Sequence, residues 1–276
     1  MLTIYSTHIT DRISYIMNIV FNEHLQIPYL LTDSIEIFNQ AEHKISYAIQ
    51  PIDNEIFIWQ HPLMIEDDIK AQTIEPFLFE GENVFFQSPV KESFLPFDLF
   101  AFSFYLLTRY EEYLPYKKDR YERFQGIESI AYKLGFLQKP LIDILVLRFV
   151  EKLKTAIPNL DYNTGKFKYI ASYDIDNAYA YKYKGFIQTI GGLLKSLYRF
   201  NIKEIANRIN VLFNKKKDPF DTYGYTSELS KKHNISNIYF ILFSEKGKYD
   251  RNLNPQNKKF QMLINQLNLE IGRAHV

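Results

Sequence analysis

The N-terminal part of the chain mixes helical and strand periodicities. Over Asp11–Leu25 the apolar residues recur at helical spacing, and Thr10 stands where a helix-capping residue belongs. Short runs that alternate or are rich in β-branched residues predict strands. These strands are expected at Leu2–Ser6, Lys44–Ile49, Glu55–Trp59, Phe77–Phe79 and Val84–Phe86. The last two are joined through Gly81 and are expected to form a hairpin.

Two longer helices are predicted next. Pro96 and Asp98 open a helix over Leu99–Tyr113 that is apolar on nearly every side until its last turn. A helix of that kind is usually buried. Pro140 begins an amphipathic helix that reaches about Ala156.

The pattern changes at Pro158–Gly165, where Pro, Asn, Asp and Gly favour turns and predict a domain boundary. Beyond it, strands predicted at Phe167–Asp176 and Asn237–Phe243 alternate with helical regions at Ile187–Phe213 and Lys258–Leu267. Such βα alternation is typical of a parallel sheet or barrel. The predicted fold class is therefore α/β, with an N-terminal α/β domain over residues 1–163 and a second α/β region after it.

Composition and charge exclude several classes of site. The 276 residues include 33 basic and 32 acidic side chains, a net charge of +1, which gives no electrostatic case for nucleic acid as a partner. Cysteine is absent, so disulfides and thiolate sites are excluded. No apolar run reaches the roughly 18–20 residues that span a bilayer, and the N-terminus lacks the features of a secretory signal. We therefore expect a cytoplasmic protein with no membrane partner.

The strongest candidate for chemistry is the segment Tyr169–Asn177, an apolar strand that ends in Asp174 and Asp176. In α/β folds the carboxyl ends of strands are where catalytic groups collect. Two carboxylates there can hold a divalent cation, or one can act as a general base. The simpler alternative is that both acids cap the next turn.

An Asp-x-Asp strand end fits three chemistries. In haloacid-dehalogenase-type phosphatases the first Asp is the nucleophile; Ser244 would suit their second motif, but Ala178 stands where Thr or Val is usual. Nucleotide-sugar glycosyltransferases normally need a nucleotide-binding unit upstream, and no Gly-rich phosphate loop is visible. Metal-dependent polysaccharide deacetylases also use acids at the end of their first barrel strand.

The wider sequence resembles the third class. The segments Asp174–Gly185, Asp218–Tyr223 and Gly247–Asn252 resemble bacterial polysaccharide-deacetylase-like proteins of the carbohydrate esterase family-four type. Two further segments, Phe97–Pro115 and Ala131–Pro140, resemble the uncharacterised domain that precedes the deacetylase in those proteins.

The resemblance implies a fold and a reaction. Residues 164–272 would be the first part of a (β/α) deacetylase-type barrel, and the reaction would be metal-dependent hydrolysis of acetyl groups on a carbohydrate. Asp174 would be the catalytic base and Asp176 a ligand of a divalent metal, with zinc the expected ion. In better-known members the two acids are adjacent, whereas here Ile175 separates them, so the two roles could be exchanged.

The family completes its metal site with a His-x-x-x-His-like segment on a later strand. Glu270–Gly272 stands where that segment would begin, and the chain then reads Arg273–Val276. Those last residues match one frame of a common sequencing adapter, so we expect residues 273–276 to be a non-native tail and His275 not to be a ligand. On this expectation the chain is a C-terminally truncated fragment and inactive as given. The alternative from another class is a non-enzymatic binding or scaffold module with a degenerate barrel.

Three smaller features of the sequence are expected to have structural roles and no role in binding or catalysis. The run Lys215–Lys217 is expected to be a solvated turn, and Gly191 and Gly192 are expected to bend the helical region. Arg109 and the two acids after it are expected to pair at a helix end.

Overall fold

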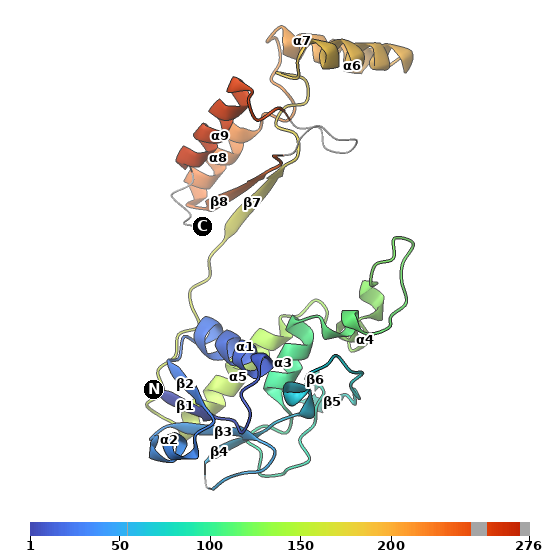
Figure 1. Ribbon diagram of the computed structural model, residues 1–276. Coiled ribbons are helices and arrows are strands. Elements are labelled where there is room, and N and C mark those ends of the chain that lie inside the picture. Colours follow the sequence, from blue (N-terminus) through green and yellow to red (C-terminus); the bar gives the residue numbers. More distant parts are fainter. Residues whose placement is uncertain (54, 244–252, 271–276) are drawn as a thin grey trace. The chain divides into compact units, whose positions relative to one another are not determined.

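The computed structural model describes residues 1–53, 55–243 and 253–270, with only the backbone of 269 and 270. The chain divides into two compact units, unit 1 at Met1–Lys166 and unit 2 at Phe167–Val276. Figure 1 shows the elements of each unit along the chain. Among the described residues, no helix combines the length and the apolar character needed to cross a membrane.

Unit 1 is built on a four-stranded parallel sheet in the order β2-β1-β3-β4. The strands are β1 (Leu2–Tyr5), β2 (Tyr29–Thr32), β3 (Lys44–Ala48) and β4 (Ile56–Trp59). Ile4 of β1 lies opposite Leu31 of β2 and Ile45 of β3. A parallel sheet needs cover on both faces, and Figure 1 shows α1 and α2 on opposite faces of this one. The predicted class of mixed α/β with a parallel sheet is confirmed.

The first predicted helix changes type along its length. It begins as α1 (Asp11–Met17), where the Thr10 hydroxyl accepts a hydrogen bond from the Ile13 N–H at 3.2 Å. It continues as a π-helix, η1 (Asn18–His24), which leads directly to the loop before β2. Apolar spacing predicted the buried face correctly but could not distinguish α from π geometry.

The other elements of unit 1 surround the sheet. They are α2 (Ile35–Gln40), η2 (Pro62–Ile65), the antiparallel hairpin β5 (Phe77–Phe79) and β6 (Glu82–Val84), α3 (Leu99–Leu107), η3 (Tyr110–Tyr113), η4 (Gly126–Glu128), α4 (Ile130–Lys133) and α5 (Leu141–Ala156). The core joins η1, α3 and α5 through Phe21, Phe100 and Phe149, whose rings pack at 5.9–6.2 Å between centroids. Burial of these rings is a main source of the stability of unit 1.

Helix α3 is buried almost all round, as predicted, but it is shorter than predicted. It ends at Leu107 instead of Tyr113. Arg109 has φ of 54°, in the left-handed region, and the chain continues as the 3-10 turn η3. A left-handed residue cannot continue an α-helix, so the backbone at Arg109 explains the early end.

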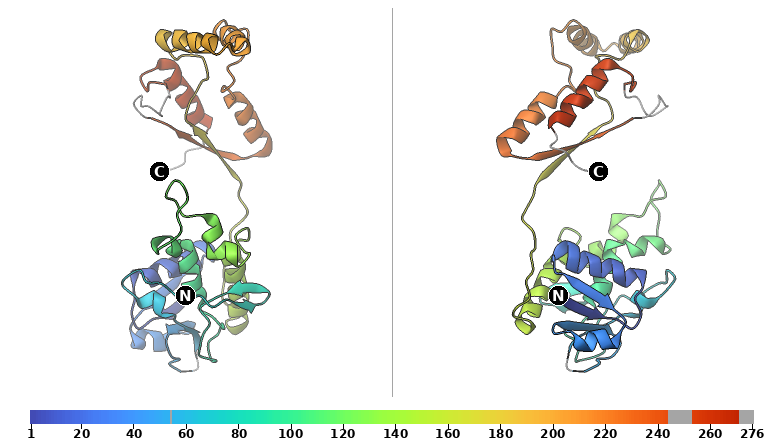
Figure 2. Two further views of the ribbon diagram at one scale, coloured as in Figure 1. Left: turned by 90° about the vertical axis from the view of Figure 1, so that its right-hand side faces the viewer. Right: turned by 60° about the vertical axis from the view of Figure 1, so that its left-hand side comes forward.

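The described residues of unit 2 form two parallel strands, β7 (Ile170–Ile175) and β8 (Ser236–Ile241). Figures 1 and 2 show α8 (Tyr223–His233) and α9 (Lys258–Glu270) on the same side of this pair. A small core around Phe260 lies on that side. The other face exposes Ile170, Ile238 and Phe240 at 43%, 37% and 58%. The described part of unit 2 is thus a βα layer and shows no barrel.

The predicted helical region at Ile187–Phe213 is two helices, α6 (Phe186–Tyr198) and α7 (Ile202–Leu212). The break lies at Phe200, whose φ is 51°. The break does not fall at Gly191 and Gly192, because both lie inside α6. A Cβ at Gly192 would come within 2.3 Å of the Arg208 side chain, so this glycine allows α6 to approach α7 closely.

Four of the described α-helices and β-strands had no clear signal in the sequence. These are β2, α2, α4 and α8. The first three are only four to six residues long, too short for periodicity to be counted. Helix α8 has a weakly apolar sequence, Tyr223–His233, in which polar side chains dominate.

Candidate functional site

The candidate site of unit 2 lies at the carboxyl end of β7. Asp174 is the penultimate residue of the strand, and Asp176 follows its last residue. Both side chains are exposed, whereas Ile175 between them is buried. Both aspartates line a cavity of about 520 Å³. The sequence pattern placed them at this strand end, and their chemical roles remain predictions.

Tyrosines from both strands form one wall of this cavity. Tyr173 of β7 and Tyr239 of β8 are opposite each other in the register and stack with centroids 5.1 Å apart. The Tyr239 hydroxyl lies 3.4 Å from the Thr226 hydroxyl of α8 and accepts a hydrogen bond from the Asn237 amide at 3.3 Å. The wall is therefore fixed to α8 as well as to the sheet.

Tyr223, at the start of α8, forms another part of the cavity lining. Its hydroxyl donates to the carbonyl of Ala178 at 2.7 Å. Burial raises the pKa of Tyr223 well above its ordinary value, so the hydroxyl stays protonated. This bond ties α8 to the turn directly after Asp176.

A buried carboxylate anchors the loop that follows the site. Asp218 is 2% exposed and accepts hydrogen bonds from the N–H groups of Ala180, Tyr181 and Lys182 at 2.8–3.0 Å, and from Phe220 at 3.1 Å. Burial by itself would raise the pKa of Asp218, but these backbone donors lower it below its ordinary value. Asp218 therefore closes the base of the segment that contains α6 and α7. The sequence identified its motif but assigned it no role.

Unit 1 has a cavity of its own, of about 510 Å³. His24, at the end of η1, lies 3.1 Å from Asp143 of α5, Nδ1 to Oδ1. Glu111 accepts a hydrogen bond from the Ile130 N–H at 2.9 Å, and burial raises its pKa. All three side chains line the cavity. Sequence spacing could not bring them together, because they come from three separate elements.

Arg109 and Glu112, which also line this cavity, form an ion pair with each other. The expected pairing at the helix end is confirmed for these two residues, whereas Glu111 bonds to the backbone of α4.

The model of a family of unknown function, DUF7033, matches residues 2–158. The chain belongs to this family. No curated protein and no solved structure matches the chain.

The DUF7033 match falls on unit 1. It includes the segment Phe97–Pro115, on which we based the resemblance to a domain that precedes deacetylases. The β7 cavity lies outside the matched residues. Membership in DUF7033 therefore describes the unit with the four-stranded sheet and leaves the site at Asp174 and Asp176 to be interpreted from its own residues.

The carboxylates of Asp174 and Asp176 are of the right chemistry for a divalent cation. Within the described ranges, no three His, Cys, Asp or Glu side chains are grouped so that they could hold a metal ion. A catalytic zinc site usually has three protein ligands, so these residues supply at most part of one. His275, Ser244 and the motif Gly247–Asn252 lie outside the described residues.

Proposed function

We propose that the protein hydrolyses acetyl groups on a carbohydrate in a metal-dependent reaction, with the β7 cavity as its site. The observation that carries the proposal is the placement of Asp174 and Asp176. Two exposed aspartates stand at the carboxyl end of one parallel strand, and both residues line one cavity. The resemblance of Asp174–Gly185 and Asp218–Tyr223 to deacetylase-like proteins supports the same reaction.

The two aspartates would have different roles. A bound cation would polarise the acyl carbonyl of the substrate. Asp176, beyond the last residue of β7, would be one of its ligands, and Asp174 would take the proton of the attacking water. Tyr239 and the half-exposed Phe220 offer aromatic surface inside the cavity against which a sugar ring could pack.

Acetate release tests this proposal. The purified protein would be incubated with zinc and an N-acetylated or O-acetylated oligosaccharide. The chain as given is expected to be inactive, so the test needs a protein in which the remaining metal ligands accompany this chain. In that protein we expect release by the wild type and by Asp161→Asn, which changes an exposed aspartate in unit 1. Asp174→Asn and Asp176→Ala should lose it. Equal rates in all four proteins would contradict the assignment of the site.

A second function, non-enzymatic carbohydrate binding, is favoured by the incomplete ligand set among the described residues. On that hypothesis the oligosaccharide binds without acetate release, and binding is the same in Asp174→Asn and Asp176→Ala. The phosphatase alternative would instead show release of phosphate from an aryl phosphate with Mg²⁺.

A further inference from the structure

The segment 182–217, here called the α6–α7 hairpin, concentrates positive charge. It contains nine Lys and Arg residues and one acid, Glu204, for a net charge of +8. The whole chain has a net charge of +1, which leaves −7 on all its other residues. A balanced overall charge therefore conceals one strongly basic segment.

The same segment exposes a large apolar surface. Ile187, Ile190, Leu194 and Leu197 follow helical spacing on one face of α6, and all four are exposed, Ile187 at 86%. The face of α6 that carries Gly192 is turned toward α7, since Gly192 lies against the Arg208 side chain. The helix thus packs on α7 through a glycine and leaves its apolar face uncovered.

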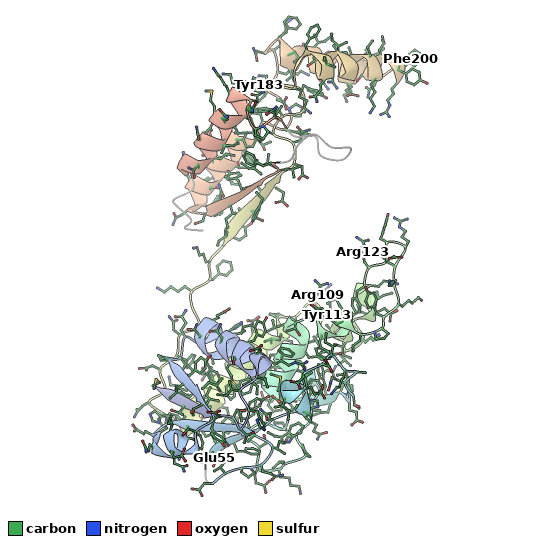
Figure 3. All side chains as sticks on the ribbon, in the orientation of Figure 1. Glu55, Arg109, Tyr113, Arg123, Tyr183 and Phe200 are labelled. Atoms are coloured by element: carbon green, nitrogen blue, oxygen red, sulfur yellow. The ribbon has the colours of Figure 1, made fainter. Side chains whose placement is uncertain are left out.

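Helix α7 and the turn before it continue this pattern. Ile202 and Ile209 lie on one face of α7, and Phe213 follows the helix directly; all three are exposed. At the turn, Tyr198 and Phe200 are exposed at 86% and 89%. Figure 3 shows Phe200 at the end of the hairpin where α6 meets α7.

We propose that the α6–α7 hairpin binds peripherally to the surface of an anionic lipid bilayer. Aromatic and aliphatic side chains at the turn and on α6 would enter the headgroup region, and the lysines and arginines would bind the anionic headgroups. This combination of exposed apolar faces and basic residues is typical of interfacial helices. The proposal departs from the expectation of no membrane partner. That expectation rested on the absence of an apolar run long enough to span a bilayer, and binding at the surface needs no such run.

The charge and the apolar surface together favour a bilayer over other occupants. A second copy of the hairpin would bring another net charge of +8 and repel the first. Nucleic acid would neutralise the charge but would leave the aliphatic face of α6 uncovered, because phosphate contacts are made by polar and basic groups. An anionic bilayer would both neutralise the positive charge and cover the aliphatic face of α6.

Vesicle flotation tests this proposal with the whole chain, because free aggregates do not float. We expect binding to vesicles of phosphatidylserine and phosphatidylcholine in equal amounts, little binding to phosphatidylcholine alone, and weaker binding at high salt. The triple variant Lys195→Gln, Arg199→Gln, Lys203→Gln should lower the affinity by at least about tenfold. Tyr198→Ser with Phe200→Ser should lower it to a similar degree.

Matched controls change the same residue types outside the hairpin. Phe167→Ser replaces a phenylalanine that is 94% exposed, and Lys231→Gln with Lys232→Gln removes two exposed charges of α8. Both should bind like the wild type. Absence of binding to the mixed vesicles, or equal loss in controls and hairpin variants, would overturn the proposal. The proposal would also be overturned if the wild type bound a single-stranded oligonucleotide and the hairpin variants lost that binding while they still bound vesicles.

Discussion

At the scale of single residues, Asp98 is a buried side chain of unit 1 that is held by four hydrogen bonds. It is fully buried and caps α3 by accepting hydrogen bonds from the N–H groups of Phe100 and Ala101, both at 2.9 Å. Its other oxygen accepts from the Tyr47 hydroxyl and the His61 N–H, both at 2.7 Å. Burial raises the pKa of Asp98 to about 6 despite these four donors.

The raised pKa gives a pH-dependent prediction. A carboxyl whose pKa is higher in the folded than in the unfolded state contributes stability below the unfolded pKa and loses it as pH rises through the folded pKa. For Asp98 that loss, between about pH 4 and pH 6, is on the order of 3 kcal/mol. Asp98→Asn should therefore be more destabilising near pH 4 than near pH 7. Urea unfolding followed by Trp59, the single tryptophan and a residue of β4, measures this directly. A loss of unfolding free energy in Asp98→Asn that becomes larger as pH rises would contradict this prediction.

His61 should show the opposite dependence. Burial lowers its pKa to about 4, and its Nδ1 accepts a hydrogen bond from the Leu63 N–H at 3.1 Å. Its stabilising contribution is present above its ordinary pKa and is lost as pH falls toward 4. His61→Asn should thus cost more stability near pH 7 than near pH 4 in the same Trp59 assay. Equal costs at both pH values would show that burial of His61 does not control its titration.

At the scale of elements, Asp218 holds both ends of the α6–α7 hairpin together. We expect Asp218→Ala to remove four hydrogen bonds to a buried carboxylate and to destabilise the hairpin base by about 1–3 kcal/mol. Hydrogen exchange should then be faster at the amides of Ala180, Tyr181 and Lys182. Asp221→Asn, a less buried neighbour, is the control and should leave these amides unchanged. Unchanged exchange in Asp218→Ala would refute the anchoring role.

Periodicity predicted most of the described strands and helices, because apolar residues recur on the face of each element that packs against the core. It failed where backbone conformation decides: α3 ends early at a left-handed Arg109, and the helical region after Ile187 breaks at a left-handed Phe200. Arg and Phe rarely adopt a left-handed backbone conformation, so neither residue type predicts it in a sequence. The placement of Asp174 and Asp176 was predictable because a strand and its end are local features.

Long-range pairs were not predictable from the sequence. The His24–Asp143 contact and the four donors around Asp98 join elements that lie far apart along the chain. The α6–α7 hairpin was missed for a different reason. Its nine basic residues are spread over residues 182–217, so a single run such as Lys215–Lys217 predicts only a solvated turn. Its exposed apolar face depends on how the helices pack, which the sequence pattern does not give.

At the scale of the whole molecule, the two units should differ in stability. Unit 1 has a contiguous core across its sheet and helices. The described residues of unit 2 bury few apolar side chains and leave one face of β7–β8 exposed. We expect strong protection from hydrogen exchange before Pro158 and weak protection after Lys168. A fragment of residues 1–166 should unfold in a single transition, and the whole chain should be prone to aggregate through unit 2. Uniform protection through residue 268 would contradict this difference.

The most direct test of the account is the separation of metal binding from turnover at the β7 cavity. Zinc affinity would be measured by calorimetry for the wild type, Asp174→Asn and Asp176→Ala, alongside acetate release. For a protein in which the remaining metal ligands accompany this chain, the account predicts that Asp176→Ala weakens zinc binding, whereas Asp174→Asn keeps zinc affinity and loses acetate release. Equal zinc affinity in Asp176→Ala and the wild type would contradict the ligand assignment.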